Sequence, residues 1–217
     1  MEEETRFSLL SEKAITISFK QEVSLQSHQR VMSLKHQLET ENWNWQIEVV
    51  PSYCSVTVFV DSSFYQNHKS LINFFESYFS SRIIQGKDPL QFVNKAKEIP
   101  VVYDGEDLEF VADYTNLSVD EIIDLHAKAE YTVAMIGFLP GFPYLVGMDD
   151  RLFVPRRETP RLKVQKGSVG LAGLQTGIYP FESPGGWQII GKTSTKLFDI
   201  EHLSFLKIGD KLRFVPV

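Results

Sequence analysis

Cationic, amide and hydroxyl side chains are concentrated between residues 156 and 192. The group comprises Arg156, Arg161, Lys163, Lys166, Gln175, Thr176, Tyr179 and Lys192. Arginine binds carboxylate and phosphate groups through paired hydrogen bonds, and lysine binds them as a point charge. Glutamine, threonine and tyrosine exchange hydrogen bonds with amides and carbonyls. These residue types favour a ligand that carries an anionic or an amide group.

The segment around these residues is unusually rich in glycine and proline. Ten of the 13 glycines and six of the ten prolines fall between Gly137 and Thr193. Helices do not tolerate this density, because proline removes a hydrogen-bond donor and glycine loses backbone entropy. We therefore expect loops held against a β scaffold, which is a common location for binding sites.

One motif in this segment formally matches a nucleotide-binding phosphate loop. Residues Gly186–Thr193 satisfy G-x-x-x-x-G-K-[ST]. A phosphate loop lies after a strand and opens a helix, with its backbone N–H groups directed at the phosphates. Here the intervening WQII predicts a strand and the following TSTKLFD shows no helix start, so we discount a nucleotide site. Lys192 still offers a charge for an anion.

His126 is the histidine that we consider for proton transfer. It precedes Glu130 by four residues, so the two side chains would share a helix face. Glu130 would then orient the imidazole for proton transfer. A surface His–Glu pair without a chemical role is the alternative.

Other reactive sites find little support in the sequence. The five histidines lack H-x-x-x-H and H-E-x-x-H spacing, so we expect no metal site. No G-x-S-x-G elbow is present, and Ser168 and Ser183 are expected to be structural turn residues. The single cysteine, Cys54, lies in an apolar run and is expected to be a core thiol in a reducing compartment.

Length, composition and charge narrow the class of protein. The 217 residues are 43% hydrophobic and 23% charged, as in soluble globular proteins. No apolar run is long enough for a transmembrane helix, and because the MEEETRF start is acidic we do not expect it to be a signal peptide. The net charge of −6 and the lack of a recognition motif argue against nucleic acid. The basic stretch from Arg151 to Lys166 is either a solvated loop or an anion-binding rim.

The first part of the chain alternates strand and helix patterns. Strands are predicted at Ala14–Phe19, Trp45–Val50 and Cys54–Val60, the last two separated by a turn at Pro51–Ser52. One helix is predicted over Val23–Leu38. A second is predicted to start after Ser63, which would cap it, and to run to about Ser80. This β-α-β-β-α order predicts a ferredoxin-like α+β domain over residues 1–88.

The second part begins at a break around Gly86–Pro89. A strand is predicted at Ile99–Tyr103, followed by a helix that starts at the capping box Ser118–Glu121 and runs to about Ala129. Tyr131–Ile136 should be a strand that leads into the glycine-rich segment. Short strands at Trp187–Ile190, Leu197–Asp199 and Lys211–Val215 favour a mostly antiparallel barrel over residues 89–217.

Several motifs in a fixed order resemble one known family. They are GFLPGFPYL (Gly137–Leu145), TPR (Thr159–Arg161), GSV (Gly167–Val169), QTGIYP (Gln175–Pro180) and SPGGWQIIGKT (Ser183–Thr193). With His126 and Tyr131 upstream, this combination resembles the 5-oxoprolinase B-subunit family, also described as allophanate hydrolase subunit 1 and as the sporulation-kinase-inhibitor family. The resemblance covers nearly the whole chain.

The resemblance implies an α+β protein, with a ferredoxin-like amino-terminal domain and a cyclophilin-like β-barrel. It implies a cytoplasmic protein that is inactive without the 5-oxoprolinase C-subunit and a LamB/YcsF-type A-subunit. The complex would open 5-oxo-L-proline to L-glutamate and hydrolyse ATP, which is the implied cofactor. The alternative that the family also contains is a regulator that inhibits a sensor histidine kinase.

Residue type and motif position together give a candidate site. We expect catalytic roles for His126, Arg161 and Lys192, which would move a proton or stabilise developing charge. We expect substrate-binding roles for a second group, which supplies hydrogen bonds, charge or pocket walls. That group is Phe138, Pro140, Phe142, Arg156, Gln175, Thr176, Tyr179, Gly185, Gly186 and Trp187.

Overall fold

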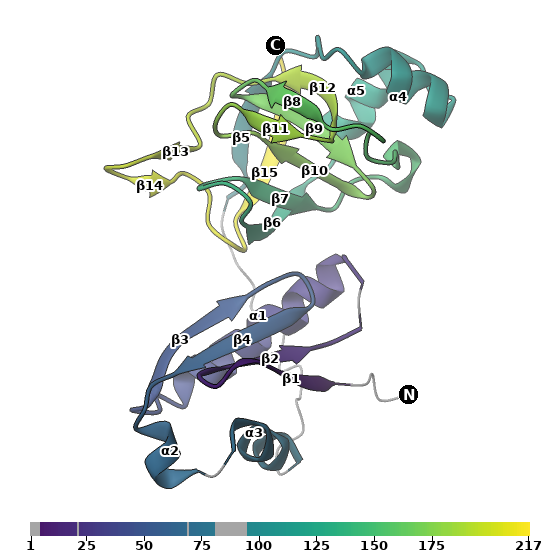
Figure 1. The fold of residues 1–217 in the computed structure, drawn as a ribbon. Helices are drawn as coiled ribbons and strands as arrows, with labels where there is room; N and C mark the ends of the chain where they lie inside the picture. The colour runs from purple at the N-terminus through teal and green to yellow at the C-terminus, as the bar shows by residue number, and fades with distance from the viewer. Residues whose placement is uncertain (1–4, 21, 69, 81–94) are drawn as a thin grey trace. The chain divides into compact units, whose positions relative to one another are not determined.

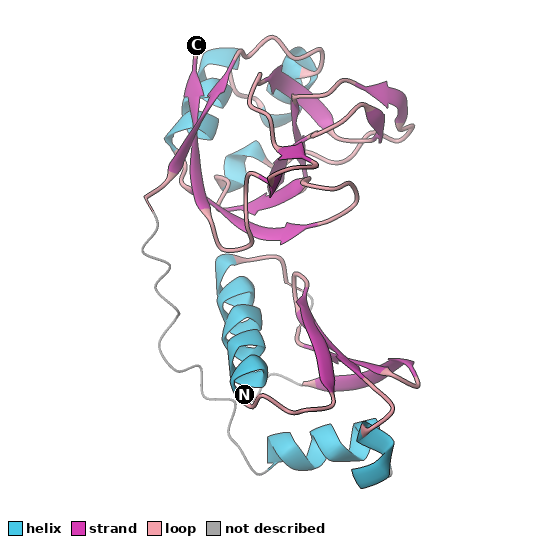
Figure 2. Ribbon diagram, turned by 90° about the vertical axis from the view of Figure 1, so that its left-hand side faces the viewer, coloured by secondary structure: helices cyan, strands magenta, loops and turns pink. Residues whose placement is uncertain are grey.

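The computed structural model describes residues 5–20, 22–68, 70–80 and 95–217. The chain divides into two compact units, Met1–Gln91 and Phe92–Val217 (Figure 1). The predicted break at Gly86–Pro89 lies outside the described residues. Each unit mixes strands and helices, so the fold is α+β (Figure 2).

The first unit packs helices against an antiparallel sheet with strand order β1-β2-β4-β3. Its elements are β1 (Arg6–Ser11), β2 (Ala14–Ser18), α1 (Leu25–Thr40), β3 (Gln46–Pro51), β4 (Ser55–Val60), α2 (Phe64–Asn67) and α3 (Leu71–Ser80). The Ser24 side chain caps α1 by accepting from the N–H of Ser27. The predicted apolar face of α1 is confirmed, since Val31, Leu34 and Leu38 are buried.

Two features of this unit differ from the prediction. The single helix expected from Ser63 is two helices, and Ser63 makes no side-chain capping bond at α2. Strand β1 escaped prediction because it is exposed along most of its length and shows no alternation. β1 pairs with β2 and forms one edge of the sheet. This edge strand precedes the predicted β-α-β-β-α elements in the chain and was not part of that prediction. The ferredoxin-like description therefore stays a prediction.

The second unit is built on a seven-stranded sheet with the order β12-β9-β10-β7-β6-β15-β5. The strands of this sheet are β5 (Lys97–Val101), β6 (Tyr131–Ile136), β7 (Pro143–Val146), β9 (Ser168–Ala172), β10 (Gln175–Ile178), β12 (Gln188–Lys192) and β15 (Lys211–Pro216). Backbone bonds between Val102 and Lys192, both 2.9 Å, join the two edges. The sheet is thus a nearly closed barrel, as predicted. The cyclophilin-like description stays a prediction.

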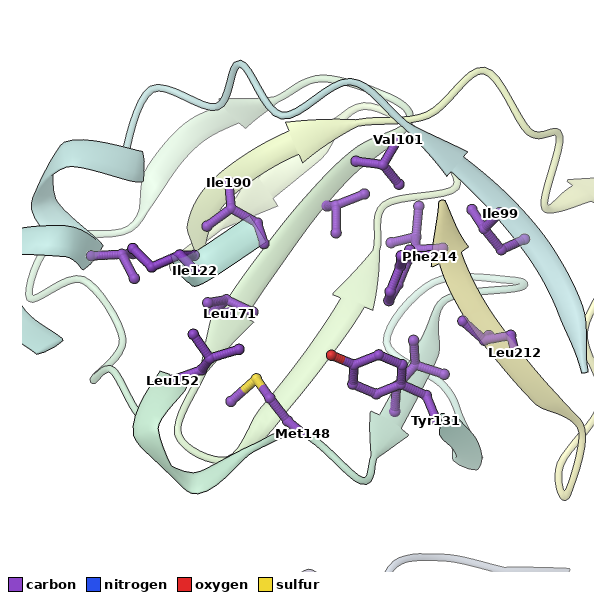
Figure 3. Close-up of a cluster of buried hydrophobic side chains, with 14 of the residues drawn as sticks. Ile99, Val101, Ile122, Tyr131, Met148, Leu152, Leu171, Ile190, Leu212 and Phe214 are labelled. Atoms are coloured by element: carbon purple, nitrogen blue, oxygen red, sulfur yellow. The ribbon is translucent and has the colours of Figure 1, made fainter. Parts of the chain in front are cut away.

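The interior of the barrel forms the main core of this unit. Figure 3 shows Tyr131 of β6, Leu171 of β9 and Phe214 of β15 converging in this cluster with Ile122 of helix α5 (Val119–Lys128). The predicted capping box is confirmed, because Ser118 and Glu121 satisfy each other's backbone N–H groups. Helix α4 (Leu108–Thr115) contributes Leu108 and Val111 to the same core.

Smaller elements complete the second unit outside the main sheet. They are the 3₁₀ turn η1 (Asp150–Leu152), strands β8 (Arg161–Val164) and β11 (Ser183–Gly185), which pair with each other, and the hairpin strands β13 (Phe198–Asp199) and β14 (Leu203–Ser204). Val164 of β8 joins a separate apolar cluster that includes Phe142, Tyr179 and Trp187. This second cluster is where several predicted site residues meet.

Candidate functional site

His126 lies inside the barrel and has no exposed surface. Its Nδ1 is 2.7 Å from the Tyr103 hydroxyl oxygen, and its Nε2 is 3.0 Å from Oγ1 of Thr176. The ring also stacks on Phe214 with a centroid separation of 4.4 Å. Two residues predicted to belong to the site, His126 and Thr176, are therefore direct partners.

The hydrogen bond that Thr176 donates determines the directions of the bonds between Tyr103, His126 and Thr176. The Thr176 hydroxyl donates to the Gly170 carbonyl oxygen at 3.1 Å, which engages its only proton. Nε2–H of His126 must then donate to Thr176, and Nδ1 accepts the proton of Tyr103. Burial lowers the pKa of His126 to about 3, so the ring is neutral near pH 7.

The predicted orientation of His126 by Glu130 is wrong. Glu130 binds Lys211 at 2.8 Å and Arg213 at 3.1 Å at the surface of the unit. Both ring nitrogens of His126 already have protein partners, and the ring does not reach the surface. In this conformation His126 does not contact a ligand that arrives from solvent.

Arg161 is fixed by a buried carboxylate that the sequence did not single out. Asp107 is 3% exposed and accepts from Arg161 at 2.7 Å, from Arg157 at 3.0 Å and from the backbone N–H of Ile189 at 2.6 Å. Arg161 also pairs with Glu106 at 2.8 Å and approaches the Trp187 carbonyl. Burial opposes the charge of Arg161, but the bonds to Asp107 and Glu106 raise its pKa overall.

Lys192 lies at the seam where the barrel closes. Its Nζ is 2.6 Å from the carboxylate of Asp104, and both side chains are largely exposed. This is a solvated surface pair, and it lies at the other end of β12 from the Arg161–Trp187 contact. Lys192, Arg161 and His126 therefore have different partners and do not form one catalytic group. The catalytic role of Lys192 stays a prediction.

An aromatic cluster forms on the outer face of the sheet. We call Phe142, Tyr144, Tyr179 and Trp187 the aromatic cluster; Phe142 contacts the other three with centroid separations of 4.8 to 5.4 Å. Gly177 lies beneath it, because a Cβ there would meet Trp187 at 2.9 Å and Phe142 at 3.0 Å. Three members were predicted, and the structure brings them together.

Glycines and polar groups frame this cluster. Gly185 lies directly against the Tyr179 ring, since a Cβ there would be 2.4 Å from the hydroxyl oxygen. The carbonyl of Gly186 accepts from the backbone N–H of Arg157 at 2.8 Å. Burial raises the pKa of Tyr179, and nearby Arg156 acts in the opposite direction. The Tyr179 hydroxyl is thus a neutral hydrogen-bonding group near a cation.

Two polar residues of the outer face have unused hydrogen-bonding capacity. Arg156 is exposed, and it makes no ion pair with any residue that the structure describes. Its charge reaches Tyr144 and Tyr179, where it opposes the rise in pKa that burial causes. Gln175, two residues before Gly177 on β10, has a buried Nε2 without a partner among the described residues. Alternation along the strand places its side chain on the same face as Gly177.

The loop between β6 and β7 carries the remaining predicted residues. Phe138 is 60% exposed and Pro140 is also exposed. Phe138 meets Phe142 edge to face at 5.7 Å, so this loop adjoins the aromatic cluster. The outer face therefore gathers Phe138, Phe142, Arg156, Gln175, Tyr179 and Trp187.

Sequence reasoning missed Tyr103, Asp107 and Tyr144. Tyr144 stands within the GFLPGFPYL motif, so its position in that motif was a usable signal. Asp107 and Tyr103 gave none, because each is one ordinary residue whose partners lie far along the chain. Their roles depend on contacts that only the closed barrel creates.

Two further predictions concern metals and membranes. Among the described residues, no cluster of three or more His, Cys, Asp or Glu side chains could hold a metal ion. Within the same residues, no helix has the length and apolar character required to cross a membrane. The discounted phosphate-loop match is β12, whose backbone pairs with β9.

Comparison with known proteins identifies close relatives. The family model described as carboxyltransferase domain, subdomain C and D, matches residues 5–205. The chain is 40% identical to the 5-oxoprolinase B-subunit of Bacillus subtilis, over 96% of this chain and 91% of that protein. It is also 40% identical to the 5-oxoprolinase B-subunit of Haemophilus influenzae, over 95% of each.

A solved structure shares the same fold over most of the chain. The crystal structure of TTHA0988 matches with a TM-score of 0.76 and 32% sequence identity. The match covers 94% of this chain but 40% of the TTHA0988 chain. That relative therefore carries a large additional segment in the same polypeptide.

Proposed function

The chain belongs to the carboxyltransferase subdomain C and D family and to the 5-oxoprolinase B-subunit family, and on this premise we propose that it is the B-subunit of an ATP-dependent 5-oxoprolinase. The complex opens 5-oxo-L-proline to L-glutamate, and the B-subunit is inactive without its partners. The observation that carries this proposal is the 40% identity to 5-oxoprolinase B-subunits over nearly the full length of both chains.

The chemistry of the outer face suits this substrate. 5-Oxoproline carries a carboxylate, a lactam amide and an apolar ring. Arg156, which is paired with no described residue, supplies a cation for the carboxylate. The Nε2 of Gln175 is buried and has no partner among the described residues, and it supplies a donor for the lactam carbonyl once the side chain turns toward the ligand. The aromatic cluster supplies an apolar wall beside them.

The geometry suggests a different division of roles from the prediction made on sequence alone. Arg161 and His126 act as positioning residues, because Asp107 and Thr176 respectively engage their side chains. Arg156 and Gln175 are the groups we expect to contact substrate. In this proposal, Lys192 acts on substrate only if a ligand displaces Asp104.

ATP is the cofactor of the proposed complex, since a lactam carbonyl is a poor electrophile until its oxygen is activated. The residues of this chain do not offer a phosphate cradle at the motif that formally resembles one. In β12 the N–H of Ile189 donates to the Asp107 carboxylate and that of Lys192 donates to the Val102 carbonyl, while Gly191 pairs with Val169. We therefore place ATP in the assembled complex and not at this segment.

We propose the 5-oxoprolinase C-subunit and a LamB/YcsF-type A-subunit as the partners, in the cytoplasm. The regulatory alternative, inhibition of a sensor histidine kinase, has no comparable support. The names of the relatives described above do not point to a kinase.

The proposal is tested by turnover in a reconstituted mixture. ATP hydrolysis and glutamate formation are measured with this protein, the C-subunit and the LamB/YcsF-type protein, with and without 5-oxoproline. We expect turnover only in the full mixture. Arg156→Ala should lower kcat/KM for 5-oxoproline by about 10- to 100-fold, the value of a charge-assisted hydrogen bond.

Arg151→Ala is the matched control. Arg151 is exposed and pairs with Asp149, and its charge acts on Glu121 at the start of α5. Its loss should leave kcat/KM unchanged. Lack of glutamate from well-folded, complete components would contradict the proposed function, and equal rates for Arg156→Ala and wild type would contradict the role of Arg156.

A further inference from the structure

Two bulky apolar residues have a backbone conformation that side chains normally avoid. Phe138 has φ of 68° and Leu203 has φ of 59°, both in the left-handed region. The other non-glycine residues with positive φ, among those described, are Asn42 and Asn116, and asparagine tolerates this region. Phe138 and Leu203 are 60% and 63% exposed, so burial of their side chains does not compensate for the strain.

The segments that carry these residues lie against each other. A Cβ on Gly141 would be 2.8 Å from the Cβ of Phe198, so the loop after β6 touches the start of the β13–β14 hairpin. The ring of Phe198 also packs on Phe181 at 5.7 Å. We call residues 137–142 and 198–205 the apolar rim.

The hairpin half of the rim presents apolar side chains to solvent. Figure 1 shows β13 and β14 extending away from the barrel as a separate ribbon. Ile200 is 89% exposed at its tip, and Phe205 is 44% exposed. A two-stranded ribbon without a covering layer is marginal by itself. Exposed apolar groups that cluster in this way mark interaction sites.

The turn of the hairpin is nevertheless held in a defined shape. The Asp199 carboxylate accepts from the backbone N–H of His202 at 2.6 Å, and Lys196 lies 3.3 Å from the other carboxylate oxygen. The bond from the His202 N–H, followed by those from Lys196, lowers the pKa of Asp199 to about 2. The tip is therefore preorganised, which reduces the entropy lost when a partner binds.

We propose that the apolar rim is the docking surface for the partner protein of the complex. This inference rests on the proposed function, which requires a partner. The occupant is the 5-oxoprolinase C-subunit of the proposed complex. The TTHA0988 chain, of which the match covers 40%, shows that a relative carries a large additional segment joined to the matched part. The contact is apolar on the side of this chain, because Ile200, Leu203 and Phe138 are its exposed groups.

The position of the rim links docking to the candidate site. Phe138 contacts Phe142, which belongs to the aromatic cluster. A partner seated on the rim therefore adjoins the face that carries Arg156 and Gln175. This position explains how a second protein completes a binding site that is open in this chain.

The test measures binding separately from turnover. The dissociation constant of the full chain for the C-subunit is measured by calorimetry, with the purified C-subunit as the probe. We expect Ile200→Asp to weaken binding at least 10-fold, because it puts a charge into an apolar contact. Leu203→Gly should also weaken binding, and glycine suits φ of 59°, so this variant retains the turn.

Ile47→Asp is the matched control. Ile47 is 65% exposed on β3 of the first unit, and the variant should bind the C-subunit as wild type does. Equal binding by wild type, Ile200→Asp and Leu203→Gly would contradict the proposed docking at the apolar rim. Turnover by the same mixture would still support the proposed function. Lack of binding by wild type would also contradict the docking. Self-association of the wild type that is lost in Ile200→Asp would also contradict the proposal, because the apolar rim would then bind a second copy of this chain.

Discussion

Asp107 is a buried carboxylate that binds Arg161, one of the predicted site residues. Its carboxylate joins Arg157, Arg161 and the backbone of β12, elements that are distant in the chain. A buried carboxylate is costly unless each oxygen is satisfied, and here both are. Asp107 therefore fixes the loop that carries Arg156 relative to Trp187 of the aromatic cluster.

Asp107→Asn should destabilise the protein by about 2–4 kcal/mol. Removal of one partner of a buried ion pair costs about 3–5 kcal/mol, and partial exposure of Arg157 reduces this. The free energy of unfolding is measured by urea titration. Asp104→Asn is the control, because the exposed Asp104–Lys192 pair should contribute only about 0–1 kcal/mol. Similar losses for the two variants would show that Asp107 is not the structural centre proposed here.

At the scale of elements, β12 decides whether the sheet becomes a barrel. It is the edge strand that meets the residue after β5, through Val102 and Lys192. Gly191 permits this approach, because a Cβ there would be 2.6 Å from the Val102 carbonyl oxygen. The glycine that suggested a phosphate loop in the sequence thus serves strand closure.

Gly191→Ala should separate this seam and destabilise the protein by about 1–3 kcal/mol, the cost of overpacking. Gly186→Ala is the matched control, because the nearest atoms to its Cβ would be 3.7 Å away. Thermal unfolding of both variants checks the expectation, together with hydrogen exchange of the Lys192 amide. Normal stability and protection in Gly191→Ala would argue that the seam does not close as described.

At the scale of the whole molecule, each unit has its own apolar core, and the barrel encloses an ionisable ring. The core of the first unit and that of the barrel share no residue. His126 is 0% exposed and its pKa is lowered to about 3, so the native barrel keeps it neutral. Such a group makes stability depend on pH.

The sign of this dependence follows from proton uptake. The unfolded chain protonates His126 below about pH 6.5, whereas the native state resists until pH approaches 3. Stability should be retained above about pH 6.5 and fall as pH decreases. Between pH 7 and pH 5 this residue should contribute a loss of about 2 kcal/mol.

Urea titrations of wild type and His126→Gln at both pH values isolate that contribution. Glutamine is selected because it retains a donor and an acceptor but does not titrate. The difference between the two pH values should be about 2 kcal/mol smaller in the variant. An identical pH dependence in both proteins would mean that His126 is not a neutral buried ring.

Local pattern determined much of the fold from sequence. Alternation predicted β2, and a β-rich apolar run predicted β4. The Ser118–Glu121 box predicted the start of α5, and WQII predicted a strand in place of a phosphate loop. These features depend on neighbours a few residues apart, so one sequence suffices. The glycine- and proline-rich segment likewise predicted loops and short strands, and three members of the aromatic cluster came from its motifs.

Only the tertiary structure decided what the polar residues do. Arg161 and Asp107 are 54 residues apart, and His126 and Thr176 are 50 apart, so neither pairing has a local signature. In the closed barrel His126 is buried and Arg161 pairs with the buried carboxylate of Asp107. Arg156 is exposed and makes no ion pair with a described residue. The sequence determined which groups were available for chemistry. Long-range packing, which brings distant strands into register, determined which of them reach a ligand.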